Sequence, residues 1–188
     1  MSERIRFAKP EDARAILDIY EPYIKNTAIT FETELITVEE FQERIARIQA
    51  KFPYLVYESE GRIAGYAYAT GYRERAAFSW DCEASVYVAG EAHRKGIGTR
   101  LYQELFELLK QMGYYNIYAY ICYPHDSSVE LHRKFGFREV GIFHKTGYKL
   151  GRWWDLIVME KALQDFEGAP DKPKTVSRID YCHIKNLL

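Results

Sequence analysis

The stretch from Asp81 to Lys110 constrains the fold more than any other part of the sequence. Residues 85–88 are mostly β-branched or aromatic, as a strand prefers, and Gly96 and Gly98 follow where that pattern breaks. Leucines then recur at helical spacing over residues 101–109. The stretch therefore predicts a strand, a tight glycine loop and an amphipathic helix, in that order.

The glycine loop lies at the start of this helix, where the backbone N–H groups have no partner within the helix. Glycine lacks a Cβ, so the loop can approach a ligand closely, and the helix dipole adds positive potential. Arg94, Lys95 and Arg100 add charge. These features favour a site for a phosphate or pyrophosphate. The alternative is an ordinary strand-to-helix turn with exposed basic residues.

Two common nucleotide-binding motifs are absent from the sequence. It has no G-x-x-x-x-G-K-[ST], and no G-x-G-x-x-G with an acidic residue at dinucleotide spacing. The run V-Y-V-x-x-x-x-H-R-K-G-I-G-T-x-L-Y, which starts at Val86, instead resembles the acetyl-CoA signature of GNAT-type N-acetyltransferases. His93 stands where that signature has Gln or Arg. The resemblance implies acetyl-CoA as co-substrate, bound by Val86, Tyr87, Val88, Arg94, Lys95, Gly96, Ile97, Gly98, Thr99, His125 and Ser128.

Length and composition favour one domain and restrict the partners. The chain has 188 residues, 47% of them hydrophobic, and a net charge of −1, which argues against nucleic acid as the main partner. No apolar run is long enough for a membrane span, and the charged N-terminus is not a signal peptide. Cys82, Cys122 and Cys182 form no disulfide or C-x-x-C framework, so we expect a cytoplasmic protein. No His, Cys and Asp cluster has metal-ligand spacing, so no metal is expected.

Periodicity and turn signals give the order strand, two helices, three strands, helix, strand, helix, two strands. The second helix follows a capping box that starts at Thr37, Gly113 ends the helix after the glycine loop, and Asp126, Ser127 or Ser128 caps the last helix. The helical crossover sets the fourth and fifth strands parallel. We expect the strands at residues 4–8, 54–57, 63–69, 78–88, 116–122, 138–143 and 153–160.

Further motifs resemble one GNAT branch, the phosphinothricin (methionine sulfoximine) acetyltransferases. They are I-R-x-A-x-x-x-D from Ile5, T-F-E from Thr30, R-x-A-F-x-W-x-x-E-x-S-V-Y-V from Arg75, P-x-x-x-S-x-x-x-H-x-x-x-G-F from Pro124 and G-x-K-x-G-x-W-x-D from Gly147. The resemblance implies a GNAT domain over residues 1–163 with a mixed, mostly antiparallel sheet, helices on both faces and a splayed parallel pair of strands. It also implies direct transfer of acetyl to a small amino-acid-like amine, and a homodimer. Phe78 and His125 depart from the branch, which usually has Tyr and Asn there.

Residues 164–188 lie beyond the resemblance and form an extension of unassigned role. Gly168, Pro170 and Pro173 make its first part linker-like, and Ile179, Tyr181, Ile184, Leu187 and Leu188 are apolar again. The apolar residues predict that the extension docks, either on its own domain or on a dimer partner.

Acyl transfer needs a neutral amine, a polarised thioester and a proton for the leaving thiolate. Glu83 is the candidate base, because burial on an apolar strand would raise its pKa; the alternative is a solvated outward carboxylate. His132 matches the histidine of the branch and is the candidate acid or second base; the alternative is a structural histidine. Phe31, Arg75, Ala77 and Phe78, with Trp80, are implied to contact the substrate, and an Arg can fork onto its carboxylate or phosphinate.

Other functions remain open at this point. One is a non-catalytic acyl-CoA sensor that keeps the glycine loop, although Glu83 and His132 together favour an enzyme. Another is an acetyltransferase for a protein N-terminus or a polyamine. A nucleophilic Cys122 beside His125 or His132 is conceivable, but a buried strand cysteine is the commoner case.

Overall fold

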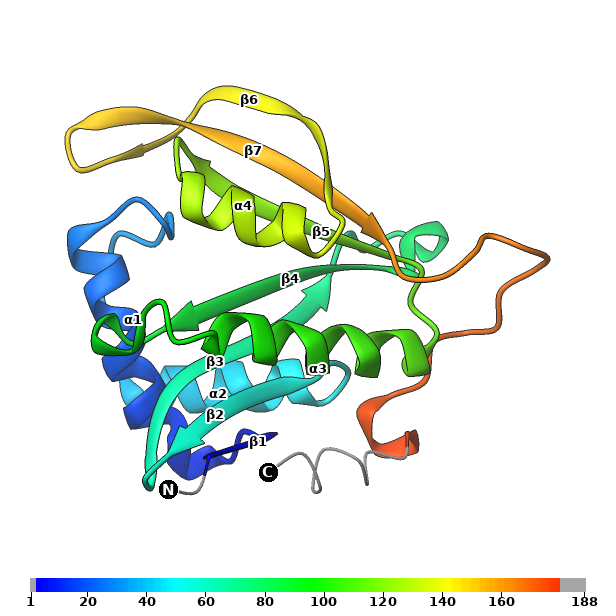
Figure 1. Ribbon diagram of the computed structural model, residues 1–188, viewed down its shortest axis with the longest axis horizontal. Coiled ribbons are helices and arrows are strands. Elements are labelled where there is room, and N and C mark those ends of the chain that lie inside the picture. The colour runs from blue at the N-terminus through cyan, green and yellow to red at the C-terminus, as the bar shows by residue number, and fades with distance from the viewer. Residues whose placement is uncertain (1–2, 180–188) are drawn as a thin grey trace.

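One seven-stranded sheet with the order β1-β2-β3-β4-β5-β7-β6 carries the helices of the chain (Figure 1). The structure is a computed structural model that describes residues 3–179. The strands are β1 (Glu3–Phe7), β2 (Tyr54–Ser59), β3 (Arg62–Gly71), β4 (Asp81–Val88), β5 (Asn116–Tyr123), β6 (Arg138–Lys149) and β7 (Arg152–Ala162). The helices are α1 (Ala13–Asn26), α2 (Val38–Gln49), α3 (Ile97–Met112) and α4 (Asp126–Lys134), with short 3-10 turns η1 (Pro10–Asp12), η2 (Ala76–Phe78), η3 (Gly90–Ala92) and η4 (Val176–Arg178).

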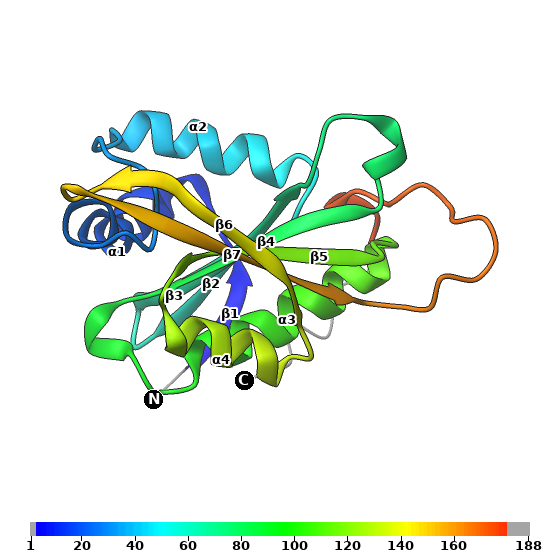
Figure 2. The ribbon, with the colours of Figure 1, turned by 90° about the horizontal axis from the view of Figure 1, so that it is seen from above.

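Helices cover both faces of the sheet, α1 and α2 on one and α3 and α4 on the other (Figure 2). The alternation of strand side chains explains the two layers. Val86 and Val88 on β4 lie near Gly98 of α3, whereas the ring of Tyr87 packs at 4.9 Å against Tyr20 of α1. The expected mixed sheet with helices on both faces is therefore confirmed.

The parallel pair of strands splays apart soon after it begins. β4 pairs with β5 only from Asp81 to Glu83, where Glu83 faces Tyr118. From that point β4 stays paired with β3, and β5 pairs with β7 along its whole length. The sheet therefore opens between β4 and β5, as the sequence analysis expected.

The start predicted for α2 and the end predicted for α3 are confirmed in the structure. The Thr37 hydroxyl accepts a 3.2 Å hydrogen bond from the N–H of Glu40, whose carboxylate accepts one of 2.9 Å from the N–H of Thr37. This reciprocal pair satisfies N–H groups at the start of α2. Gly113 ends α3 in the left-handed region, with φ of 89°, which favours glycine.

The predicted central strand at 78–88 starts three residues too early. Phe78 lies in η2, where its N–H donates to the Arg75 carbonyl at 2.9 Å, so that N–H is used in a turn. The strand predicted at 138–143 is too short, because β6 continues beyond an irregular pairing between Phe143 and Gly147. The cap of α4 was also wrong: His125 occupies this position, and no side chain caps the helix.

The described part of the extension packs on its own domain. The Gln164 side chain donates to the Tyr114 carbonyl at 2.9 Å, and the Lys174 N–H donates to the Met112 carbonyl at 2.7 Å. Ile179 is buried in the core. Tyr181, Ile184, Leu187 and Leu188, like Cys182, lie outside the described residues. Within residues 3–179, no helix is long and apolar enough to cross a membrane.

Candidate active site

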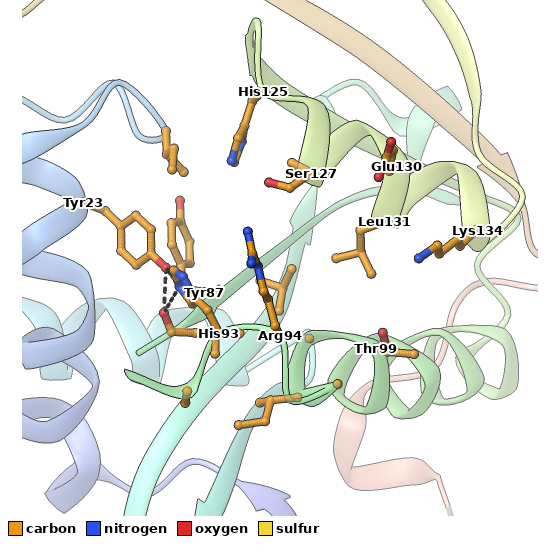
Figure 3. A pocket seen from close by; sticks show the side chains of 18 residues that line it. Tyr23, Tyr87, His93, Arg94, Thr99, His125, Ser127, Glu130, Leu131 and Lys134 are labelled. Carbon is orange, nitrogen blue, oxygen red and sulfur yellow. Dashed lines mark hydrogen bonds between the residues drawn. The ribbon is translucent and has the colours of Figure 1, made fainter. Parts of the chain in front are cut away.

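A cavity of about 520 Å³ lies beside the splayed strands, between the start of α3 and one face of α4 (Figure 3). Its walls come from the end of β4, the glycine loop and α4. Lys95 does not line it. The other predicted cofactor residues do: Val86, Tyr87, Val88, Arg94, Gly96, Ile97, Gly98, Thr99, His125 and Ser128.

The glycine loop has the geometry of an anion cradle. Gly96 adopts φ of 78° and precedes α3, and no side chain caps the first turn of that helix. Its N–H groups therefore remain for a ligand. A Cβ on Gly98 would lie 3.7–3.8 Å from Leu131, Val86 and Val88, so only hydrogen keeps this part of the cavity open. The residues present fit a pyrophosphate and the pantetheine arm that follows it.

The positive charge of the cavity comes partly from residues that the sequence analysis missed. Arg94 and, from the end of α4, Lys134 both line the cavity (Figure 3). Arg100, expected to add charge here, instead donates to the Glu3 carboxylate at 2.6 Å and to the Tyr57 hydroxyl at 2.8 Å. Its spacing of seven residues from Ser127 could have indicated this position for Lys134, because residues two turns apart lie on the same face of a helix. Also missed were Tyr23, Ile29, Ala92, Glu130 and Leu131.

His93 lines the cavity, and its Nε2 also contacts other parts of the protein. Its Nε2 lies 3.0 Å from the Val88 carbonyl and 2.9 Å from the Tyr23 hydroxyl. Because a carbonyl only accepts, Nε2 carries the proton, and the Tyr23 hydroxyl donates to the same carbonyl at 2.6 Å. His93 thus joins the end of β4 to α1.

A smaller chamber of about 60 Å³ continues from the cavity through the gap between β4 and β5. Ala84 and Ala119 line it from the α3 side of the strands, whereas Ser85 and Tyr120 belong to the opposite side. Val86, Tyr87, His125 and Ser128 line both spaces. The chamber therefore connects the two faces of the sheet.

His132 is a buried wall of this chamber and is only 3% exposed. Its Nδ1 lies 2.7 Å from the Ser128 carbonyl, and its Nε2 lies 3.2 Å from the Tyr102 hydroxyl. Burial lowers the pKa of His132, so the neutral form dominates near neutral pH. Tyr102, on α3, also lines the chamber and was missed by the sequence analysis.

Glu83 lies on β4 at the last residue before the strands part. It is half-buried, and burial raises its pKa, which is the environment expected for a base. Its side chain lies on the same face as that of Ser85, two residues further on. Glu83 itself lines neither the cavity nor the chamber.

The predicted substrate residues lie in two separate loops. Phe31 packs onto β6, where a Cβ on Gly147 would be 2.7 Å from its ring. Arg75 and Ala77 are exposed in the turn between β3 and β4. Phe78 is half-buried, with the Arg73 guanidinium 5.5 Å from its ring centre. None of Phe31, Arg75, Ala77 and Phe78 lines the cavity or chamber.

Trp80 was expected on the substrate side, and its indole N–H is used within the protein. Its indole N–H donates to the backbone carbonyl of Asp171 in the extension at 2.7 Å. Two tyrosines that the sequence did not suggest as site residues lie at this turn, with the rings of Tyr72 and Tyr118 stacked at 4.2 Å.

No metal or cysteine chemistry is evident in the described residues. Within residues 3–179, no three His, Cys, Asp or Glu side chains form a possible metal site. Burial raises the pKa of Cys122, which disfavours the reactive thiolate.

Comparisons with known proteins identify the family. The model of the acetyltransferase (GNAT) domain matches residues 5–158. Phosphinothricin N-acetyltransferase of Streptomyces viridochromogenes is 37% identical over 170 residues, which are 90% of this chain and 91% of that protein. The L-methionine sulfoximine/L-methionine sulfone acetyltransferase of Salmonella typhimurium is 32% identical over 171 residues, with coverage of 89% and 98%.

A solved structure agrees with this result. The phosphinothricin acetyltransferase of Sinorhizobium meliloti, in complex with acetyl-CoA, superposes with a TM-score of 0.88 at 34% identity and covers 95% of this chain and 98% of its own. The chain belongs to the GNAT acetyltransferase family. It is an acetyl-CoA-dependent N-acetyltransferase, similar to the phosphinothricin and methionine sulfoximine enzymes.

Proposed function

We propose that the protein acetylates the amine of a small amino-acid-like substrate of the phosphinothricin, methionine sulfoximine or methionine sulfone type. The names of the relatives support this acceptor class. Direct transfer of acetyl from the thioester to the amine is supported by one observation. The chamber between β4 and β5 connects the cofactor cavity with the face that bears Glu83. A thioester entering from the α3 side meets an amine from the other side, with no enzyme-bound acetyl required.

In this proposal each reacting group has a defined task. The glycine loop and Arg94 hold the pyrophosphate of acetyl-CoA. Glu83 takes the proton of the attacking amine, through a water because it does not line the chamber. His132 is the source of the proton that the departing sulfur needs. Arg75, with Phe31, Ala77 and Phe78, recognises the acceptor, and the exposed guanidinium of Arg75 can bind a carboxylate or phosphinate.

The test is the release of thiol from acetyl-CoA with a panel of acceptors. Phosphinothricin, methionine sulfoximine and methionine sulfone should give higher kcat/KM than their decarboxylated amine analogues of similar size. Equal or faster turnover of a polyamine or of a peptide N-terminus would show that the acceptor belongs to that class and not to the amino-acid-like amines. Acetyl-CoA binding without thiol release for any amine would contradict catalysis and favour the acyl-CoA sensor.

We further propose that the protein acts as a homodimer through the β6–β7 hairpin. This edge exposes large apolar side chains, which single chains seldom leave uncovered. Val140, Phe143, Tyr148, Leu150 and Trp153 are 55–59% exposed. A second copy would cover them. Sedimentation should give twice the chain mass, and Trp153→Glu should give a monomer; a monomeric wild type would contradict the proposal.

A further inference from the structure

The neutral form of His132 has no proton to give to the chamber. Because the Ser128 carbonyl can only accept, the 2.7 Å contact places the imidazole proton on Nδ1. Nε2 then carries a lone pair, to which the Tyr102 hydroxyl donates across 3.2 Å. In the dominant form, the proton nearest the chamber is therefore on Tyr102 rather than on His132.

Tyr102 is built rigidly into the chamber wall. It is 1% exposed, and its ring packs against Phe106 at 4.7 Å, Phe135 at 5.8 Å and His132 at 5.3 Å. Burial raises the pKa of Tyr102, so it keeps its proton until a strong acceptor appears. Tyr102 lines the chamber of about 60 Å³, so a thiolate formed there would be such an acceptor.

We propose that Tyr102 is a catalytic residue that contacts the sulfur of acetyl-CoA, and that His132 acts through it. This inference rests on the proposed acetyl transfer. The amine nitrogen forms the C–N bond, the C–S bond breaks, and its electron pair stays on sulfur. Sulfur takes the hydroxyl proton of Tyr102, and the Tyr102 oxygen takes the Nε2 proton of the imidazolium form of His132. The proton lost by nitrogen goes to Glu83; Glu83 then releases it to water, and His132 regains one from water.

The pH dependence of this relay comes from His132. Its titratable neighbours are Tyr102 from α3 and His125 from the start of α4, whose charge further lowers the pKa of His132. Phe137, from the segment before β6, covers another side at 5.0 Å. The residues that line the chamber include Tyr87 and Tyr120 but no Asp, Glu, Lys or Arg. Loss of the imidazolium proton therefore sets the alkaline limb of the rate.

The kinetic test is Tyr102→Phe, which keeps the ring and removes the hydroxyl. We expect kcat to fall about 100-fold, the lower end of the usual loss for one acid–base group, with little change in the KM for acetyl-CoA. The alkaline limb assigned to His132 should disappear, and Tyr102→Phe/His132→Ala should be no slower than either single variant. Tyr114→Phe is the control, because Tyr114 is also buried but lines neither space.

Wild-type kcat and pH profile in Tyr102→Phe, or effects of the two variants that multiply, would overturn the proposal. Nitrogen-15 NMR of wild-type His132 gives a second test that needs no variant. The neutral ring should carry its proton on Nδ1, and a proton on Nε2 would overturn the relay. Any amine that the wild type acetylates can serve in the kinetics. Failure of phosphinothricin alone would therefore count against the proposed acceptor and not against Tyr102.

Discussion

The indole N–H of Trp80 donates a 2.7 Å hydrogen bond to the backbone carbonyl of Asp171, 91 residues further along the chain. The Trp80 carbonyl also accepts a 2.8 Å bond from the N–H of Tyr115. Trp80 thus joins the start of β4, the turn before β5 and the C-terminal extension. The exposed turn that carries Arg75 and Phe78 leads directly into this junction.

Replacing Trp80 by Phe should test what the junction does. A smaller aromatic ring remains and the Asp171 carbonyl loses its donor, so the free energy of unfolding should fall by at least about 1 kcal/mol. A looser turn should raise the KM for the amine more than that for acetyl-CoA. Denaturant unfolding and steady-state kinetics measure the two effects. Asp171→Ala is the control because it keeps the backbone carbonyl; equal KM changes for both substrates would show that the junction does not position the turn.

Gly98→Val should block the cofactor without unfolding the protein. A Cβ at this position lies at ordinary contact distances from Leu131, Val86 and Val88, and the methyl groups of valine would take space needed by the pantetheine arm. We expect the acetyl-CoA Kd to rise at least about tenfold, a cost of about 1.4 kcal/mol. Gly96 is a poorer site for this test because its φ of 78° would strain any side chain.

Calorimetry with CoA measures this effect directly. Gly90→Ala serves as the control, because nothing lies within 4 Å of a Cβ at that glycine. Unchanged CoA affinity in folded Gly98→Val would place the pantetheine arm elsewhere.

Glu83→Gln should remove the acidic limb of the pH–rate profile. A base works when deprotonated, and burial raises the pKa of Glu83, so wild-type activity should fall as the pH drops through a value above the usual ~4.3. Glutamine keeps the volume but takes no proton, so kcat should fall ~10²–10⁴-fold while the KM for acetyl-CoA changes little. Glu107→Gln, on the exposed face of α3, is the control. Activity within about threefold of wild type would make Glu83 structural.

Lys149→Met should loosen the loop that carries Phe31. Lys149 is buried, and its Nζ donates to the Thr30 carbonyl at 2.7 Å and to the Tyr23 carbonyl at 3.4 Å. Removing this donor should cost ~1–3 kcal/mol of stability because Thr30 is itself buried. Denaturant unfolding checks this, with the exposed Lys110→Met as control.

The pH dependence of that stability has a definite sign. Burial lowers the pKa of Lys149, so the unfolded chain binds more protons between the lowered value and ~10.4. Wild-type stability should gain from rising pH in this window, and Lys149→Met should lose that gain. A stability difference between wild type and variant that shrinks as the pH rises would contradict this account.

The sequence was sufficient for the elements whose signals are local. The capping box at Thr37, the glycines around α3 and the strand patterns are set by neighbouring residues. Most of the residues that the family motifs assign to the cofactor line one cavity. The roles of Glu83 and His132, the cytoplasmic location and the absence of nucleic-acid partners stay predictions.

What failed depends on contacts between distant residues. Arg100 looks like a phosphate ligand by position, but it pairs with Glu3, which β1 brings beside α3. The bond from the Trp80 indole N–H to the extension could not be foreseen, because its acceptor lies 91 residues further along the chain. In the sequence Tyr102 looks like an ordinary core residue of α3. The packing of α4 against α3 brings His132 beside its hydroxyl.

The narrow gap between β4 and β5 also limits which acyl group can be transferred. The cofactor cavity of about 520 Å³ opens into a chamber of only about 60 Å³, so the thioester end meets the tightest part of its path. Ala84, Ala119 and Ile121 line this chamber, so each methylene added to an acetyl group should crowd its wall. The size of the sheet opening should therefore limit the length of the acyl donor, whereas the loops on the other face are proposed to bind the acceptor.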